Sequence, residues 1–438
     1  MSSIFRHRIS KLVFVAVMIT IVVDTQIFRI FGFINERSSA TTLVIFGITA
    51  IVFALWQYTP FRLFSQMLNK SIIVSKQHFI LRWMHKGISI SQHFLLALLV
   101  IAFLQIIIVS SYNMLILEAA LCTSYFLSLV LIGFLSYRFF MWFKFNHDPV
   151  VFSYALAMVV ISANALFTPL YIIWDLQNVP LHVQALKQSG MPFSSADNLF
   201  YNSYIVTSVM SFILTWFATV LLLHHYSNKF GRVKYWIIIS LPLIYFIGPF
   251  QLQFLELFYD IRLTYPVIFN LIYTIAFSVI KPAGGLLFGF AFWTIARSLG
   301  DLPIKHYVSI SGYGIMLLFL SNQASGLNIA PYPPFGMSSI SYLPSASYFI
   351  LVGIYTAAIS VAQDTKLRKE IRRSVETHTD LLDRIGASQL EQQIHQRIEG
   401  LSGIVADSEE SIDTLPSDEE IRDYIDQVIN EVRQKDGE

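Results

Sequence analysis

Long apolar runs alternate with short polar connections along most of the chain, from Lys11 to Gln363. About 20 helical residues, rising ~1.5 Å each, cross the ~30 Å hydrocarbon core of a bilayer, and each run has roughly that length. Because hydrocarbon offers the backbone no hydrogen-bond partner, such runs must be helices. We therefore predict about ten transmembrane spans, at Leu12–Phe33, Thr41–Tyr58, His93–Tyr112, Leu115–Tyr137, Val150–Ile173, Tyr201–Leu223, Tyr235–Leu257, Tyr265–Ala296, Tyr307–Ser325 and Ser345–Gln363.

Lysine and arginine are distributed unevenly between alternate connections. The connections on one side hold fifteen of them, whereas those on the other side hold only Arg37, Lys187 and Arg262. Basic residues accumulate on the cytoplasmic side of membrane proteins. The bias predicts an all-α polytopic bundle in the cell membrane with both termini in the cytoplasm.

Composition agrees with this class and divides the chain. Hydrophobic residues make up 55% and charged residues 13% of the 438 positions, whereas soluble domains average about 25% charged. Residues 1–363 form the predicted membrane domain, and residues 364–438 have a net negative charge. The single cysteine, Cys122, excludes an internal disulfide and a multi-cysteine metal site.

The tail is predicted to be helical and cytoplasmic. Residues 364–404 form a juxtamembrane helical or coiled segment, broken or kinked at Gly386, and residues 405–416 form an acidic linker. A capping box of Ser417 and Glu420 starts an amphipathic helix over residues 417–438. Its apolar stripe, which needs a partner, consists of Ile421, Tyr424, Ile425, Val428, Ile429 and Val432. That partner is the tail itself, the inner face of the bundle, a second copy or another protein.

Two connections have a distinct character. Pro60–Gln92 is basic and partly apolar, which is typical of a helix lying in the inner membrane interface; an ordinary basic loop is the alternative. Gly326–Pro344 is uncharged and rich in proline, so we expect an irregular outer loop that folds back over the bundle.

Two of the charged residues inside predicted spans lie well away from the span ends. Asp24 lies in the first span, and Lys281 lies near the middle of the eighth. A charge at the bilayer centre costs about 3 kcal/mol or more, so neither side chain should face lipid. They either pair across the bundle, line a polar path, or are neutralised locally by a hydrogen-bonding neighbour. The amides Asn164, Asn270 and Asn322 complete the candidate polar site, although such residues more often hold helices together.

The eighth span also contains a candidate helix break at Pro282, Gly284 and Gly285. Proline removes a backbone hydrogen bond, and glycine lets the chain unwind. Broken helices expose backbone groups to solutes in several transporter folds. The alternative is a kinked but continuous helix, because proline and glycine are common in membrane spans.

No catalytic, metal-binding or phosphate-loop motif is present, so the sequence predicts neither an enzyme nor a cofactor, and no nucleic-acid partner. The bilayer and a protein bound to the tail are the expected partners.

Four segments carry a resemblance: Tyr332-Pro-Pro-Phe-Gly336, Ala358-Ile-Ser-Val-Ala-Gln-Asp364, Lys366-Leu-Arg-Lys-Glu-Ile-Arg-Arg-Ser374 and Leu381-Leu-Asp-Arg-Ile-Gly386. They resemble multi-pass archaeal membrane proteins of unknown function. The resemblance implies an archaeal-type membrane protein with a cytoplasmic helical tail, and it assigns no functional residue.

Two functions are compatible with these features. A last span that leads into a charged helical tail favours a non-enzymatic membrane sensor or scaffold. The alternative is a solute or ion transporter that uses Asp24, Lys281 and a broken eighth helix.

Overall fold

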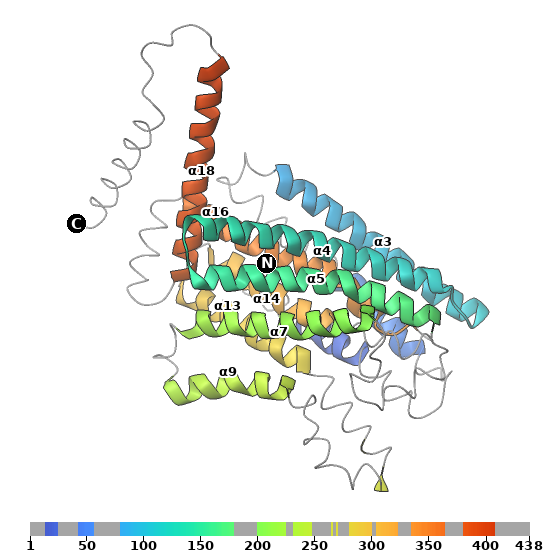
Figure 1. Ribbon diagram of the computed structural model, residues 1–438. Coiled ribbons are helices and arrows are strands. Elements are labelled where there is room, and N and C mark those ends of the chain that lie inside the picture. The colour runs from blue at the N-terminus through green and yellow to red at the C-terminus, as the bar shows by residue number, and fades with distance from the viewer. Residues whose placement is uncertain are drawn as a thin grey trace, which may run out of the picture. The chain divides into compact units, whose positions relative to one another are not determined.

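A computed structural model of the protein describes residues 14–24, 43–56, 79–178, 199–224, 231–247, 264–265, 269, 280–299, 304–322, 334–363 and 380–407. Every regular element among them is a helix, which confirms the predicted all-α class. Two short apolar helices, Phe14–Asp24 and Leu43–Trp56, come first. The helices that follow are α3 (Phe79–Val109), α4 (Met114–Phe145), α5 (Pro149–Asn178), α7 (Leu199–His224), α9 (Arg232–Ile247), α13 (Ile280–Ser298), α14 (Ile304–Ser321), α15 (Met337–Ser341), α16 (Leu343–Gln363) and α18 (Asp380–Asp407). All of them except α15 are labelled in Figure 1.

Five of the described helical stretches are long and apolar enough to cross a membrane. They are Trp83–Val109, Met114–Phe145, Pro149–Gln177, Leu199–His224 and Met337–Ala362. Only 28% of the most apolar window of α3 is buried, and its exposed residues include Ile101, Leu104 and Ile108. So large an exposed apolar face suits lipid rather than water. The chain is therefore compatible with a membrane protein, while the count of ten spans and the side of the termini stay predictions.

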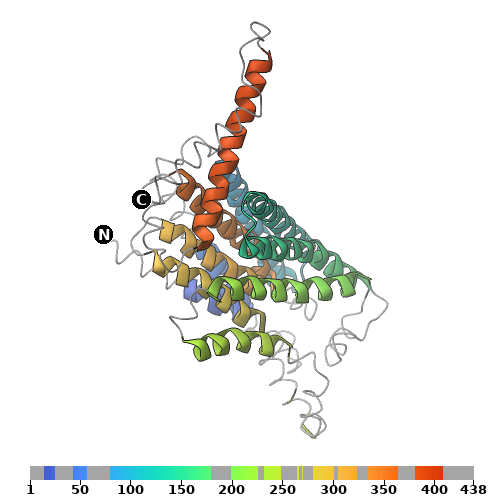
Figure 2. The ribbon, with the colours of Figure 1, turned by 60° about the vertical axis from the view of Figure 1, so that its left-hand side comes forward.

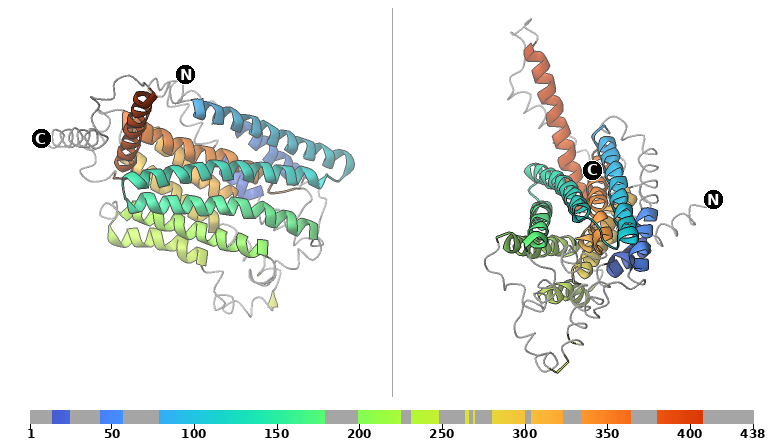
Figure 3. Two further views of the ribbon diagram at one scale, coloured as in Figure 1. Left: turned by 45° about the horizontal axis from the view of Figure 1, so that its top comes forward. Right: turned by 90° about the vertical axis from the view of Figure 1, so that its right-hand side faces the viewer.

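The most buried helix is the one that leads towards the tail. In the stretch Met337–Ala362, 89% of the residues in the most apolar window are buried. α16 packs against α14, α4 and α3, and α4, α5 and α7 lie side by side in sequence order (Figure 3). The last predicted span is therefore the central helix of this unit, which comprises residues 1–390; residues 391–438 form a second unit.

Glycine allows the central helices to approach closely. A Cβ atom on Gly289 of α13 would lie 2.8 Å from the carbonyl oxygen of Gly312 in α14, and one on Gly312 would lie 2.8 Å from the Trp293 ring. Small residues at such contacts are typical of helix packing in membranes.

The structure corrects the predicted start of the third span. α3 begins at Phe79, so the second part of the connection Pro60–Gln92 continues the span; residues 60–78 lie outside the described part. Ile88, Gln92, Leu95 and Leu99 are all buried and share one helix face across the predicted boundary at His93. The end of this connection and the predicted span therefore form one helix, which packs along a single buried face.

The predicted irregular loop Gly326–Pro344 is also partly wrong. Its described residues, from Pro334 onwards, are buried, and they form α15 and the start of α16. Pro344 is the second residue of α16, where a proline is tolerated because the first-turn amides have no helical acceptor.

In the tail, α18 passes through Gly386 without a break, which contradicts the predicted break, while the alternative of a kink stays a prediction. A Cβ atom at Gly386 would lie 2.3 Å from Cγ1 of Val361, so this glycine serves close packing against α16. The amphipathic segment 417–438 lies outside the described residues.

Candidate functional site

Polar side chains from four helices meet in one hydrogen-bonded cluster. Asn322, directly after α14, donates from Nδ2 to Oδ1 of Asn164 on α5 at 2.9 Å. Its own Oδ1 accepts a 3.0 Å hydrogen bond from the hydroxyl of Tyr125 on α4. Asn164 Nδ2 donates to Oγ1 of Thr207 on α7 at 3.1 Å and lies 3.4 Å from the carbonyl oxygen of Tyr204. The cluster therefore joins α4, α5, α7 and the end of α14.

Lys281, in the first turn of α13, reaches the same cluster. Its Nζ atom lies 3.4 Å from the carbonyl oxygen of Asn322 and 5.7 Å from the centre of the Tyr204 ring. The Tyr204 ring stacks on Tyr171 of α5 at 5.1 Å between ring centres. The ammonium therefore has one long hydrogen bond and one aromatic face as neighbours.

The two amide side chains of the cluster have hydrogen-bond partners for both their N–H and C=O groups, whereas the Lys281 ammonium has a partner for one of its N–H groups. Asn322 and Asn164 each use both ends of the side-chain amide, with Asn164 fully buried. Lysine has three N–H donors, and within the described part of the chain no carboxylate pairs with Lys281. The Lys281 ammonium is half-buried, and its described neighbours are electrically neutral, so its positive charge is not compensated within the cluster.

Three of the five predicted polar residues thus come together, namely Lys281, Asn164 and Asn322, whereas Asn270 lies outside the described residues. That they bind a ligand stays a prediction. Tyr125, Tyr204 and Thr207 were missed, because tyrosine and threonine are frequent in these spans and their sequence positions do not show which of them face another helix.

Asp24 lies elsewhere, so pairing with Lys281, which was one of the predicted alternatives, is wrong. Its Oδ2 atom accepts hydrogen bonds from the backbone N–H of Ser339 at 3.0 Å and from the hydroxyl of Ser339 at 2.7 Å. Asp24 is fully buried, and among the described residues its Oδ1 atom lies without a hydrogen-bond partner of good geometry. The carboxyl group therefore anchors the first helix to α15. This agrees with the alternative prediction that Asp24 has a hydrogen-bonding neighbour.

The predicted helix break is not present at the two glycines. Gly284 and Gly285 are helical within α13, and each packs tightly: added Cβ atoms would lie 2.2 Å from the Phe212 ring and 2.8 Å from Cβ of Phe319. Pro282 also lies within the helix, as the third residue of α13. Close packing, rather than unwinding, accounts for this pair of glycines.

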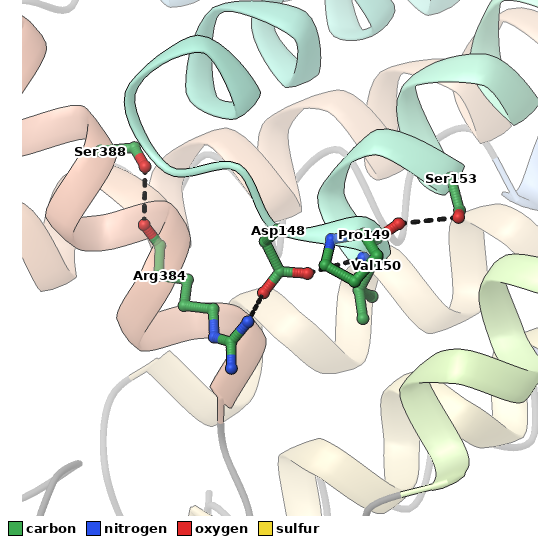
Figure 4. A network of polar contacts seen from close by, with 6 residues as sticks. All are labelled: Asp148, Pro149, Val150, Ser153, Arg384 and Ser388. Carbon is green, nitrogen blue, oxygen red and sulfur yellow. Dashed lines mark hydrogen bonds and ion pairs between the residues drawn. The ribbon is translucent and has the colours of Figure 1, made fainter.

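A second polar site joins the tail to the bundle (Figure 4). Asp148 is buried and caps α5, because its Oδ1 atom accepts from the backbone N–H of Val150 at 2.6 Å. Its Oδ2 atom forms an ion pair with Arg384 of α18. Trp142 of α4 donates from Nε1 to Oε1 of Gln389 at 2.9 Å. We call Asp148, Trp142, Arg384 and Gln389 the tail dock.

α4 and α5 belong to both sites. Figures 1 and 2 show the first part of α18 beside the ends of α4 and α5, and the polar cluster lies further along the same helices. Tyr125 and Trp142 are separated by roughly 25 Å along α4, and Asn164 and Asp148 by about the same distance along α5. The two sites are therefore connected by the same pair of packed helices.

Within the described residues, no three His, Cys, Asp or Glu side chains are arranged to hold a metal ion. Comparison with known proteins gives no significant match to a protein family, to a curated protein or to a solved structure. The likeness to archaeal membrane proteins therefore has no support from these comparisons.

Proposed function

We propose that the protein is a non-enzymatic membrane sensor, in which a stimulus at the polar cluster changes the position of the cytoplasmic tail. The observation that carries this proposal is that α4 and α5 hold the polar cluster at one level and the tail dock at another. If the packed pair α4 and α5 has two arrangements, a stimulus that favours one of them changes the polar cluster and the tail dock together.

The distribution of basic residues supports a direction for the signal. Arg138 and Lys144 lie near the dock end of α4, whereas the opposite connection after α5 has Lys187 alone. On this basis the dock faces the cytoplasm and the polar cluster lies in the outer half of the membrane. A stimulus reaching the cluster from outside then has its readout inside the cell.

The tail provides the output. Leu381, Leu382 and Ile385 of α18 are buried within the first unit, so the beginning of the tail is packed as part of the bundle. The apolar stripe predicted over residues 417–438 supplies a surface for a protein partner or for self-association.

Hydrogen–deuterium exchange tests this function. Asn322→Leu removes the central amide, so the Tyr125 hydroxyl loses its acceptor and Oδ1 of Asn164 loses its donor. We expect exchange of residues 380–390 to increase by about fivefold or more, which corresponds to a coupling of ~1 kcal/mol. Gly87→Ala is the control, because a Cβ atom there meets nothing within 4 Å. Faster exchange near residue 322 with unchanged exchange over 380–390 would contradict the proposal.

A second candidate function is solute transport, which the unbalanced charge of Lys281 favours. Intramembrane charges often line substrate or ion paths. The continuous helix through Gly284 and Gly285 removes one argument for it. Flux into proteoliposomes that is lost in both Lys281→Met and Asp24→Asn would support transport, and flux that survives both changes would exclude these residues from the path.

A further inference from the structure

The polar cluster contains one group whose interactions are incomplete. Every amide of the cluster donates and accepts within it, and the Tyr125 hydroxyl donates to Asn322. Lys281 differs, because the neighbours that the described residues offer it within hydrogen-bond or cation–π range are the Asn322 carbonyl oxygen and the Tyr204 ring. Neither neighbour carries a formal charge that balances an ammonium.

We propose that Lys281 binds an oxyanion, of the carboxylate or phosphate type, at the junction of α13, α7 and α14. This inference rests on the proposed sensor function and names the chemistry of its stimulus. The anion supplies the missing charge, and two N–H groups of Lys281 are available to donate to its oxygens. The fixed amides of Asn164 and Asn322 hold the surrounding helices, so the site is formed before the anion arrives.

The depth of Lys281 agrees with such a ligand. Lys281 and Ser298 lie near opposite ends of α13, about 25 Å apart along the helix axis. As part of this proposal we place Ser298 at one boundary of the ~30 Å core, which puts Lys281 close to the other boundary. An anion dissolved in water and the phosphate of a lipid headgroup can both reach this level. The shared chemistry is an oxyanion, and the experiment separates the two sources.

Thermal unfolding of the purified protein tests the site in two settings. In lipid-free detergent, sodium phosphate is titrated against sodium chloride at equal ionic strength. In nanodiscs, phosphatidylglycerol is compared with phosphatidylcholine. Because phosphate also stabilises proteins non-specifically, the relevant quantity is the difference between variants. Lys281→Met removes the charge, Lys281→Arg keeps it, and Lys144→Met is the matched control at an exposed lysine of α4.

We expect a saturable rise in Tm of about 2 °C or more for the wild type, Lys281→Arg and Lys144→Met in at least one setting, and its loss in Lys281→Met. A response in detergent identifies a soluble anion, and a response in nanodiscs alone identifies a lipid phosphate. Equal responses in all four proteins, or none in either setting, would overturn the inference.

The result is distinguishable from that of the sensor proposal. Anion binding that depends on Lys281 without any change in exchange over residues 380–390 leaves this site in place and removes the coupling. Coupling to residues 380–390 without anion binding would support the sensor proposal and remove the anion site.

Discussion

Asp24 illustrates how an acidic residue in an apolar helix is accommodated by hydrogen-bond donors from a distant segment of the chain. Both hydrogen bonds to its Oδ2 atom come from Ser339, which is 1% exposed. Sequence alone identifies Asp24 as unusual, because a charge in an apolar run is costly. It does not identify Ser339, since the two residues lie on segments far apart in the chain and serine is common.

Replacing Asp24 separates the role of its hydrogen bonds from that of its charge. Asp24→Ala leaves two buried donors of Ser339 without an acceptor, so we expect a loss of about 1–3 kcal/mol in the free energy of unfolding. Asp24→Asn retains an accepting oxygen, and its effect should be much smaller. Denaturant unfolding in detergent measures both. An equal loss in both variants would mean that the negative charge itself is required.

The helices were predictable from the hydrophobic pattern, while several of their boundaries were not. α4, α5 and α7 begin and end within a few residues of the predicted spans, except that α4 continues to Phe145. The start of α3 and the helix α15 depend on burial against other helices, which is a tertiary effect. Glycines were read as points of flexibility, whereas Gly284, Gly285 and Gly386 are points of contact.

The contact between α13 and α14 leads to a prediction about two glycines. Gly289→Ala places a methyl group 2.8 Å from a backbone oxygen, and overpacking of this kind costs about 1–3 kcal/mol. Gly87→Ala, on an exposed face of α3, should instead stabilise the protein by roughly 0.5–1 kcal/mol through helix propensity. Thermal melts of the two variants should therefore shift in opposite directions. Similar shifts for both would contradict the close approach of the two helices.

The tail dock leads to a prediction about the attachment of α18. Arg384→Met leaves the buried carboxylate of Asp148 without its cation, so we expect α18 to detach more readily and residues 380–390 to become more sensitive to protease. In the Asp148→Asn background, which keeps the cap on α5, the same change should have a smaller effect. Equal protease sensitivity of Arg384→Met in both backgrounds would show that the ion pair does not hold the tail.

At the scale of the molecule, the membrane class follows from composition and pattern, and the exposed apolar face of α3 agrees with it. The shared polarity of Lys281, Asn164 and Asn322 suggested that these residues meet. It did not suggest that Asp24 lies apart from them. Residues in different spans meet according to how the helices pack, and hydropathy does not contain that information. The tail dock was missed for the same reason.

The orientation can be tested by chemical labelling. In a Cys122→Ser background, we expect a cysteine at Lys187 to react with a membrane-impermeant maleimide on intact cells, and cysteines at Lys229 and at Glu438 to react only after the membrane is opened. Reaction of the carboxyl-terminal cysteine on intact cells would contradict the predicted topology.

The central claim is that the polar cluster and the tail dock are energetically coupled through α4 and α5. A double-mutant cycle of Asn322→Leu and Arg384→Met, read as free energies of unfolding in detergent, measures that coupling directly. The account predicts that the two effects depart from additivity by about 0.5–2 kcal/mol, although the sites are too far apart to touch. Additivity within about 0.3 kcal/mol would contradict the account, because it is the result expected for independent sites.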